Sequence, residues 1–559
     1  MSRGLSFLEW VDHHPDSYFW LVSGLIVLAL ILATGPLWKG RYDDTPGHDW
    51  WWGLLILAIL AAGRWPSLLY SREIGVDESQ LLAGAHALTR DPVFWRSVIG
   101  GTAGPLDFFA LWPAGWICGW DTYLTARLTA LALLAASLIL AHQSMALVWG
   151  RPIARLAGLV AVTLESLTCA MDFLHYSTEL VPLTLLSVAA YAAVQRWATR
   201  GGPGWNALGG LMLGAVPLAK LQGVPLAAAM GLCWVWAELR AGEKSTARHR
   251  ACLIAGALFP AALLASQLTV AGEWQGFIIS YVSFNFHYAA AGQATYGRTL
   301  LVMLGAARWW DPLLLLGLVG LLGWLTLMLR LHRVPPRTTR LLGWAAFAAG
   351  LIAFGSIIAP MRPYLHYWQL LLVPSVFFLG AMIARLLTTS PPPWRRREQW
   401  LVALGALAAV GLMLQHRARN PNPFVGHLAF FGRSPRTELA DHVAGRARPG
   451  EAMVLWGRAD NLYVETGLRQ ATRYSEITSL VEAGPLQEYA RAHYLADFRR
   501  NKPELFVDVT CPAAFQFKTP EYAHERNFPA LAAAVSADYV LVEEFAQARI
   551  YRRKDLAGR

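Results

Sequence analysis

The sequence predicts an all-α polytopic membrane protein of about 12 transmembrane helices with a small C-terminal periplasmic α/β domain. The chain of 559 residues is 55% hydrophobic and contains 25 Trp residues, whereas soluble domains are roughly 45 to 50% apolar. Apolar runs long enough to cross a bilayer recur along most of the chain. Its final part instead alternates short β-rich runs with polar helical stretches. These observations favour a membrane body followed by a folded domain outside the bilayer.

Twelve apolar runs account for the predicted membrane body. Each is about 20 residues long, the length of helix that crosses roughly 30 Å of hydrocarbon. Because backbone N–H and C=O groups must be paired inside a bilayer, runs of this length are expected to be helical. The predicted spans are 18–37, 50–67, 122–148, 156–174, 179–198, 205–221, 223–239, 251–270, 311–330, 341–359, 366–386 and 399–415.

The distribution of Lys and Arg predicts how these spans are oriented. One set of short loops and helix ends contains 18 of these residues, while the opposite set, which is longer in total, contains 9. Positive charges resist translocation, so the first set is expected on the cytoplasmic side of a bacterial inner membrane. Most of the excess positive charge lies in these loops, where membrane lipids explain the net charge of +11. A nucleic-acid partner is therefore not expected.

The predicted domain boundary lies in the polar, Pro-containing stretch "QHRARNPNPFVGH". Residues 1–416 form the predicted membrane body. Residues 417–559 form the predicted periplasmic α/β domain, with the β-rich runs "AMVLWG", "ELFVDV", "YVLVEEF" and "ARIYRRK". This domain shows no catalytic triad, metal-ligand set or nucleotide-binding loop, so we expect it to recognise an acceptor or to cover an external cavity. Two external loops of the body, 68–121 and 271–310, are rich in aromatic residues and Gly and are expected to lie along the membrane interface.

Ionisable side chains gather at the external ends of the predicted spans. Asp77 and Glu78 follow the second span, and Glu179 lies at the turn between the fourth and fifth. Residues distant in the chain thus place acids and bases on one membrane face. The cationic or titratable residues at later external turns are Lys220, Arg362 and His366.

Such a set suits the transfer of a sugar from a lipid phosphate. A carboxylate can take the proton from an acceptor hydroxyl as it attacks the anomeric carbon, while Lys, Arg or His stabilises the charge on the departing phosphate. The sequence has no nucleotide-binding Gly-rich loop on the cytoplasmic side, so an activated sugar is expected to arrive attached to a membrane lipid. Inversion at the anomeric carbon is expected, because one attack with one base needs no covalent intermediate.

The chain resembles the GT-C superfamily of glycosyltransferases that use lipid-linked sugars, in particular its branch of protein mannosyltransferases and aminoarabinose transferases. The resemblance covers roughly residues 50–386 and is carried by "GVDESQLLAGAHAL", "GPLDFFALWPAGWICGWDTYLTARLTALALL", "STELVPLTLL", "GGLMLGAVPLAKLQGVPL" and "PYLHYWQLLLVPSVFFLG". The sequence departs from many relatives at Gly104-Pro105, where they have two prolines, and from some at Glu179, where they have Asp. An additional span, 18–37, precedes the matching part.

This resemblance implies a GT-C-like fold and a role for each external residue. Asp77 is implied to be the catalytic base, Glu78 to orient the acceptor or bind a divalent ion, and Glu179 to be the acid of the second loop. These residues allow a divalent metal but do not require one, and no other cofactor is expected. The residues implied to contact the donor phosphate are Lys220, Arg362 and His366.

The implied function is that of an inverting glycosyltransferase on the periplasmic face of the inner membrane. It would move a hexosyl or pentosyl group from a polyprenyl-phosphate-linked donor to a hydroxyl of a lipid, protein or glycan acceptor. A transporter or flippase of lipid-linked saccharides is the main alternative. It would favour charges near helix centres, discontinuous helices and an internal repeat, whereas here the charges lie at helix ends and no repeat is found. A glycan polymerase or ligase would also act externally, with a diphosphate-linked donor.

Structural roles compete with these functional roles. Asp77 and Glu78 could interact with the dipole of the helix that they begin, which is worth about 0.3 to 1 kcal/mol, and Glu179 could cap its span. Lys220 could extend to the lipid headgroups without binding a ligand.

The remaining two residues have structural alternatives as well. Arg362 precedes a Pro at a helix end and could anchor the headgroup region. His366 begins an apolar run and could be a packing residue. Proximity of these residues to one another would favour the functional roles.

Overall fold

The structure is a computed structural model that describes residues 10, 13–38, 46–240, 246–290, 295–306, 337–389, 392–426, 436–512, 514–545 and 548–557. The chain divides into two compact units. Unit 1 comprises Met1–Leu68, Ala130–Leu264 and Ala289–Leu428, and unit 2 comprises Leu69–Thr129, Ala265–Tyr288 and Ala429–Arg559. Unit 2 therefore contains much of the two predicted external loops together with the C-terminal region. The predicted boundary at residue 416 stays a prediction.

Eight helical segments among the described residues are long and apolar enough to cross a membrane, which makes the chain a multi-pass membrane protein. Three shorter helices, of 17, 13 and 17 residues, coincide with three more predicted spans: α8 (Arg151–Leu167), α11 (Pro203–Ala215) and α12 (Val224–Arg240). The predicted span 311–330 lies outside the described residues. The eight long segments include α2 (Pro15–Trp38), α3 (Trp50–Leu69), α7 (Leu124–Trp149), α10 (Leu180–Ala198), α13 (Ala247–Ala271), α18 (Arg337–Ile358), η5 (Leu365–Leu371) with α19 (Leu372–Thr389), and α20 (Pro392–Arg419).

Short elements connect these helices. In unit 1 they include α9 (Met171–Leu174), η1 (Val216–Leu218), η2 (Leu221–Gly223) and α16 (Tyr296–Ala306). The segments of the two predicted external loops are helical as well, which agrees with their aromatic and half-apolar composition. They form α4 (Val76–Leu88), α5 (Pro105–Phe109), α6 (Trp112–Cys118), α14 (Trp274–Phe277), the π-helical segment η4 (Ile278–Ser283) and α15 (Phe284–Ala290).

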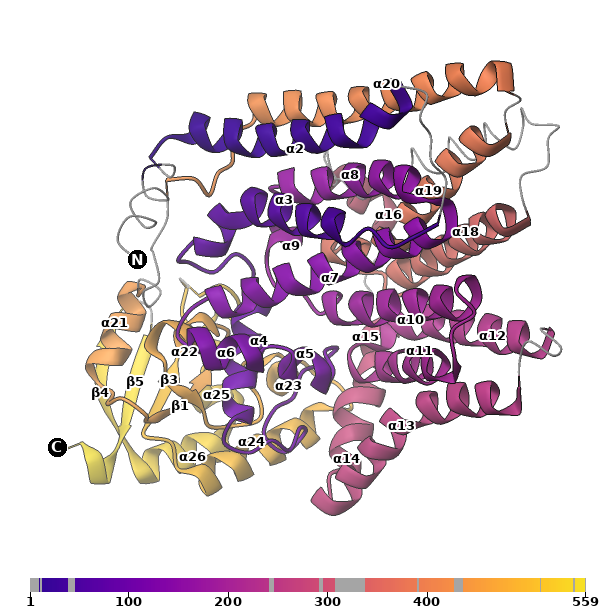
Figure 1. Ribbon diagram of the computed structural model, residues 1–559. Coiled ribbons are helices and arrows are strands. Elements are labelled where there is room, and N and C mark those ends of the chain that lie inside the picture. The colour runs from indigo at the N-terminus through magenta and orange to yellow at the C-terminus, as the bar shows by residue number, and fades with distance from the viewer. Residues whose placement is uncertain are drawn as a thin grey trace. The chain divides into compact units, whose positions relative to one another are not determined.

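Within unit 1, helices distant in sequence pack in pairs. Helices α2 and α20, from opposite ends of the membrane body, lie side by side (Figure 1). Helices α3 and α8 are joined by an ion pair between Arg64 and Glu165, with nitrogen and oxygen 2.7 Å apart and side chains only 4% and 3% exposed. A charge within an apolar segment needs such a partner, because lipid offers none.

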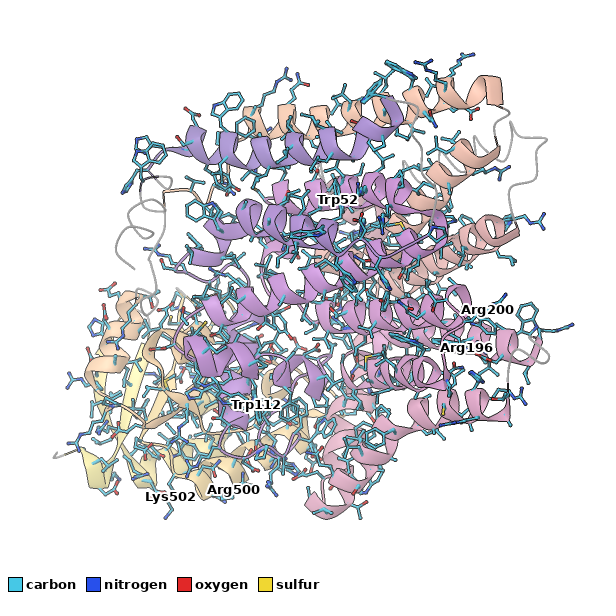
Figure 2. The ribbon with its side chains drawn as sticks, viewed as in Figure 1. Trp52, Trp112, Arg196, Arg200, Arg500 and Lys502 are labelled. Carbon is cyan, nitrogen blue, oxygen red and sulfur yellow. The ribbon has the colours of Figure 1, made fainter. Side chains whose placement is uncertain are left out.

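A second buried ion pair joins α10, α11 and α12. The Arg196 side chain donates to both carboxylate oxygens of Glu238 at 3.0 and 3.2 Å, and the Asn206 amide donates to the same carboxylate at 2.8 Å. Arg196 and Arg200 follow one another near the end of α10 (Figure 2). The polar contacts fix the end of α10 against its two neighbours.

Helices α11 and α13 approach closely enough for their backbones to touch. A Cβ atom at any of three positions would lie 2.1 to 2.3 Å from a carbonyl oxygen of the other helix, namely at Gly210, Gly214 and Gly256. Only Gly fits such a contact, and small residues of this kind are typical of helix pairs in membranes. Helix α11 continues directly into η1, and Lys220 follows in the turn before η2.

Unit 2 is built on a mixed five-stranded sheet of order β2-β1-β3-β5-β4. Strand β1 is parallel to β2 and β3, while β5 is antiparallel to β3 and β4. The four predicted β-rich runs are β1, β3, β4 and β5, and only the two-residue β2 was not predicted. The strands are β1 (Ala452–Trp456), β2 (Arg469–Gln470), β3 (Leu505–Asp508), β4 (Tyr539–Phe545) and β5 (Ala548–Arg553).

Helices pack beside this sheet in the C-terminal region (Figure 1). Arg500 and Lys502 lie at the C-terminal end of α24 (Figure 2), where cations interact favourably with the helix dipole. The elements are α21 (Glu438–Gly445), α22 (Asn461–Thr466), α23 (Thr478–Val481), α24 (Gln487–Asn501), η6 (Pro520–Tyr522), α25 (His524–Asn527), α26 (Pro529–Asp538) and η7 (Lys554–Leu556).

Helix α4 from the first external loop contributes to the core of the C-terminal region. It contacts α22 and β2. Ala83 of α4 belongs to the same buried apolar cluster as Leu455 of β1, Leu462 of α22 and Val507 of β3. The C-terminal region therefore supports the helix whose first turn contains Asp77.

Candidate active site

A buried ion pair joins Glu179 and Lys220 in unit 1. Glu179 immediately precedes α10, and Lys220 lies in the tight turn between η1 and η2. The Lys220 ammonium donates to a Glu179 carboxylate oxygen and, at 2.5 Å, to the Thr178 hydroxyl oxygen. The two side chains are 4% and 0% exposed. Each charge depends on the other, because removing either one leaves an unpaired charge in a low-dielectric interior.

The surroundings of this pair contradict two structural roles considered from the sequence. The Lys220 ammonium lies 4.8 Å from the centroid of the Tyr367 ring, so the side chain is directed into the protein and not to the lipid headgroups. Glu179 precedes α10 but makes no side-chain cap to it. Both residues are instead parts of one polar cluster.

His366 lies beside the same carboxylate. It belongs to η5, the 3-10 segment that leads into α19. Its Nε2 is 4.0 Å from Glu179 Oε2, and its Nδ1 is 3.0 Å from Asp172 Oδ1. The Tyr364 ring stacks on the imidazole with ring centroids 5.5 Å apart. The structure thus brings three of the predicted site residues together in unit 1: Glu179, Lys220 and His366.

Asp172 is a member of this cluster that the sequence analysis missed. It lies in α9, and its backbone carbonyl oxygen accepts a hydrogen bond from Gln369 Nε2 at 3.3 Å. Burial raises the pKa of the Asp172 carboxyl, but the hydrogen bond and charge of His366 outweigh burial and hold this pKa below its ordinary value. The available signal was the spacing Asp172-x-x-His175, which places an acid and a His on one side of a helical turn.

Arg362, the third predicted phosphate contact, is half-buried in the segment between α18 and η5. The preceding residue, Met361, has a φ of 51° in the left-handed region, where the chain turns after α18. Arg362 precedes His366 by four residues in the chain. A role of Arg362 in phosphate binding stays a prediction.

Asp77 and Glu78 lie in the first turn of α4 in unit 2, in different environments. Glu78 is fully buried and pairs with Arg127, whose Nε and NH2 lie 2.9 and 3.0 Å from its two carboxylate oxygens. Asp77 is half-buried, and its carboxylate has no hydrogen-bond or ion-pair partner among the described residues. One acid is therefore held in place by a cation, while the other has no such partner among the described residues.

Arg127 also holds the segment that precedes α4. Its guanidinium donates to the backbone carbonyl oxygens of Tyr70 and Arg72, the second at 2.5 Å. One side chain from α7 therefore connects this segment to Glu78 and fixes where α4 begins. The sequence offered a signal, because an Arg inside an otherwise apolar run needs a buried partner.

Glu73, just before α4, has an unusual environment in unit 2. Burial raises its pKa to about 7, and the charges of Asp460, Glu78 and Glu465 act in the same direction. The Ser79 hydroxyl donates to the Glu73 carboxylate, which offsets part of this effect. Glu73 is thus a carboxyl that changes charge near neutral pH.

Two groups among the described residues have the side chains and spacing to hold a metal ion. One is Asp172, His175 and His366 in unit 1, and the other lies in the C-terminal region. The expectation that the C-terminal region lacks a metal-ligand set stays a prediction. In this second group a cation already pairs with the acids, because Arg549 donates to both carboxylates. Its members are Asp508, His524 and Glu525.

Comparison with solved structures identifies the fold. ArnT from Cupriavidus metallidurans bound to undecaprenyl phosphate matches with a TM-score of 0.59 and 13% sequence identity, over 91% of this chain and 99% of that chain. ArnT from the same organism in the apo state matches with a TM-score of 0.56, at the same identity and coverage. No family model and no curated protein sequence matches the chain.

The chain therefore has the fold of the ArnT structures. The similarity to ArnT extends along nearly the whole length of the chain. The fold implied by the sequence resemblance is therefore confirmed, including the mainly helical membrane body and the small C-terminal sheet.

Proposed function

We propose that the protein is an inverting glycosyltransferase that moves a sugar from a polyprenyl-phosphate-linked donor to an acceptor hydroxyl. The observation that carries this proposal is the buried cluster of Glu179, Lys220 and His366, which a GT-C fold holds in unit 1. The ArnT structure with undecaprenyl phosphate supports a lipid phosphate as the donor's carrier. The Lys and Arg distribution supports a site on the periplasmic face of a bacterial inner membrane.

The proposed reaction breaks the bond between the anomeric carbon and the phosphate oxygen. The acceptor oxygen attacks the anomeric carbon, its proton passes to the Asp77 carboxylate, and polyprenyl phosphate departs with the bonding electrons. Attack from the face opposite the leaving group inverts the anomeric configuration. The acceptor, whether lipid, protein or glycan, supplies only a hydroxyl.

Cations of unit 1 are proposed to stabilise the phosphate as it departs. An ammonium has three N–H donors, and Lys220 directs two of them to Thr178 and Glu179. Glu179 and Thr178 hold the ammonium in place, so Lys220 is ready for a phosphate oxygen without reorganisation. Arg362 and His366 are proposed as the other phosphate contacts.

Glu78 is proposed to orient the acceptor region indirectly. Its carboxylate is bound by Arg127, so its contribution is to hold the first turn of α4 and with it the backbone of Asp77. A divalent ion bound by Glu78 is not part of this proposal.

The test is transfer from a radiolabelled polyprenyl monophosphate sugar by the purified protein in lipid. Wild-type protein should form a labelled product, Asp77→Asn should form none, and Asp538→Asn, which changes an exposed Asp, should match the wild type. The linkage of the product should be inverted relative to the donor. Movement of the labelled lipid across vesicles without an Asp77-dependent product would instead identify a flippase.

A further inference from the structure

Three possible metal ligands converge beside the Glu179–Lys220 pair. Asp172 and His175 come from the α9 turn, and His366 comes from η5. One donor atom from each lies within 4.8 Å of the other two. His366 lies almost two hundred positions after Asp172 and His175 in the chain, so the fold brings it to the other two.

The hydrogen bonding of His175 fixes which of its nitrogens can bind a metal. Its Nδ1 lies 3.0 Å from the Tyr176 backbone carbonyl oxygen. A carbonyl only accepts, so Nδ1 is the donor in this contact and Nε2 is the nitrogen left for a metal. Metal-binding His residues commonly donate their other N–H to a backbone carbonyl in this way. The contact of His175 with the Tyr176 carbonyl is therefore the one that a metal ligand commonly makes through its other nitrogen.

The geometry of His366 fits the same ion. Its Nδ1 lies 3.0 Å from Asp172 Oδ1, close to the separation of about 3.3 Å between two ligands that each lie about 2.0 Å from a tetrahedral ion. With Nδ1 on the ion, the Nε2–H faces Glu179 Oε2 at 4.0 Å. A carboxylate behind a ligating His is a common outer partner.

Burial and exposure in this cluster suit an ion with open coordination positions. His175 and His366 are 5% and 8% exposed, while the Asp172 side chain is 35% exposed. The imidazoles are thus held rigidly and the carboxylate gives access from outside. Two imidazoles and one carboxylate favour Zn²⁺ or a similar transition metal over Mg²⁺ or Ca²⁺, which prefer oxygen ligands.

We propose that Asp172, His175 and His366 bind one divalent transition-metal ion beside Lys220. Binding of the ion stands on the geometry alone. Its use in sugar transfer rests on the proposed function: with the ion bound, His366 would act on the departing phosphate through the ion and not by direct contact, and the ion would add to the positive charge there. The simple alternative is that Asp172 and His366 form only an ion pair with each other.

The experiment uses full-length protein in detergent, freed of any polyhistidine tag, stripped with a chelator and titrated with Co²⁺. Wild type should bind one Co²⁺ per chain with a visible d–d absorption. Asp172→Asn and His175→Gln should each weaken binding by at least about tenfold. Glu525→Gln, which removes a ligand of the other group, should bind like wild type. Wild type without the absorption, or loss of binding only in Glu525→Gln, would overturn the proposal.

A second variant keeps the test independent of folding defects. His175→Cys replaces one ligand by a thiolate, so bound Co²⁺ should gain a sulfur-to-metal charge-transfer band in the near ultraviolet. Co²⁺ binding without this band would place the ion elsewhere and overturn the proposal. Asp77→Asn separates the two proposals, because it should abolish transfer and leave Co²⁺ binding unchanged. Transfer that survives in Asp77→Asn would count against the proposed function alone.

Discussion

Arg127 donates to both carboxylate oxygens of Glu78, at 2.9 and 3.0 Å, and both side chains are 0% exposed. Two adjacent acids in the first turn of α4 therefore lie in different environments. Glu78 is part of the internal structure of unit 2, and Asp77 remains half-buried without a bound cation among the described residues. A pair of carboxylates in different environments is typical of sites that use one of them as a base.

Replacing Glu78 by Gln is expected to destabilise the protein more than replacing Asp77 by Asn. The first change leaves the Arg127 charge unpaired in the interior, which costs on the order of 3 to 5 kcal/mol. The second should abolish transfer while leaving stability nearly unchanged. Thermal unfolding followed by intrinsic fluorescence, together with product formation, distinguishes the two. Equal unfolding midpoints for Glu78→Gln and wild type would show that the buried pair does not hold α4.

The Lys220 and Glu179 charges are expected to be coupled. Lys220→Met and Glu179→Gln should each destabilise the protein by on the order of 3 kcal/mol, because each leaves one buried charge alone. The double variant should be more stable than the sum of the single effects by about 1 to 3 kcal/mol. Transfer should be lost in all three variants. Additive destabilisation in a double-mutant cycle would argue against a direct pair.

The raised pKa of Glu73 predicts that the protein becomes less stable as the pH rises. Its folded pKa of about 7 exceeds the ordinary value of 4.5, so the folded state holds a proton that the unfolded state has lost. Stability should therefore decline between about pH 4.5 and 7, by at most about 3 kcal/mol. Glu73→Gln should flatten this decline in thermal unfolding, while the exposed Glu521→Gln should retain it. An unchanged slope in Glu73→Gln would refute the assignment.

Removal of the C-terminal region is expected to expose α4. The helix packs on α22 and β2, and Ala83 lies in their shared apolar core. Truncation after residue 426 should therefore increase hydrogen exchange of residues 76–88 by several orders of magnitude and abolish transfer. A truncated protein that protects these amides and transfers sugar undiminished would contradict a supporting role for the C-terminal region.

Local pattern was sufficient for most of the secondary structure. Long apolar runs predicted eleven helices that the structure describes, and alternating β-rich runs predicted β1, β3, β4 and β5. Both patterns reflect how a single segment is buried, so each can be recognised within that segment alone. The packing of α4 into the C-terminal core carries no such signal, because it joins Ala83 to residues more than three hundred positions away.

The candidate site was also predictable only in part, because local patterns show single residues and not their partners. Charge at helix ends pointed to Glu179, Lys220 and His366, and the structure joins them. The partners that hold site residues were missed, although Asp172 had a visible spacing to His175 and Arg127 stood alone in an apolar run. Which charges pair depends on contacts between segments far apart in the chain, and local sequence patterns do not show those contacts.

The touching backbones of α11 and α13 have a consequence for the Lys220 turn. The hydrophobic effect does not drive helices together in lipid, so van der Waals contact between closely packed helices must supply the attraction. Helix α11 continues into η1 and then Lys220, so the position of the lysine depends on the contact between α11 and α13. A single methyl group added at Gly214 would collide with the α13 backbone and displace α11. The Lys220 ammonium would then move as well, although Gly214 itself has no group that could contact a phosphate.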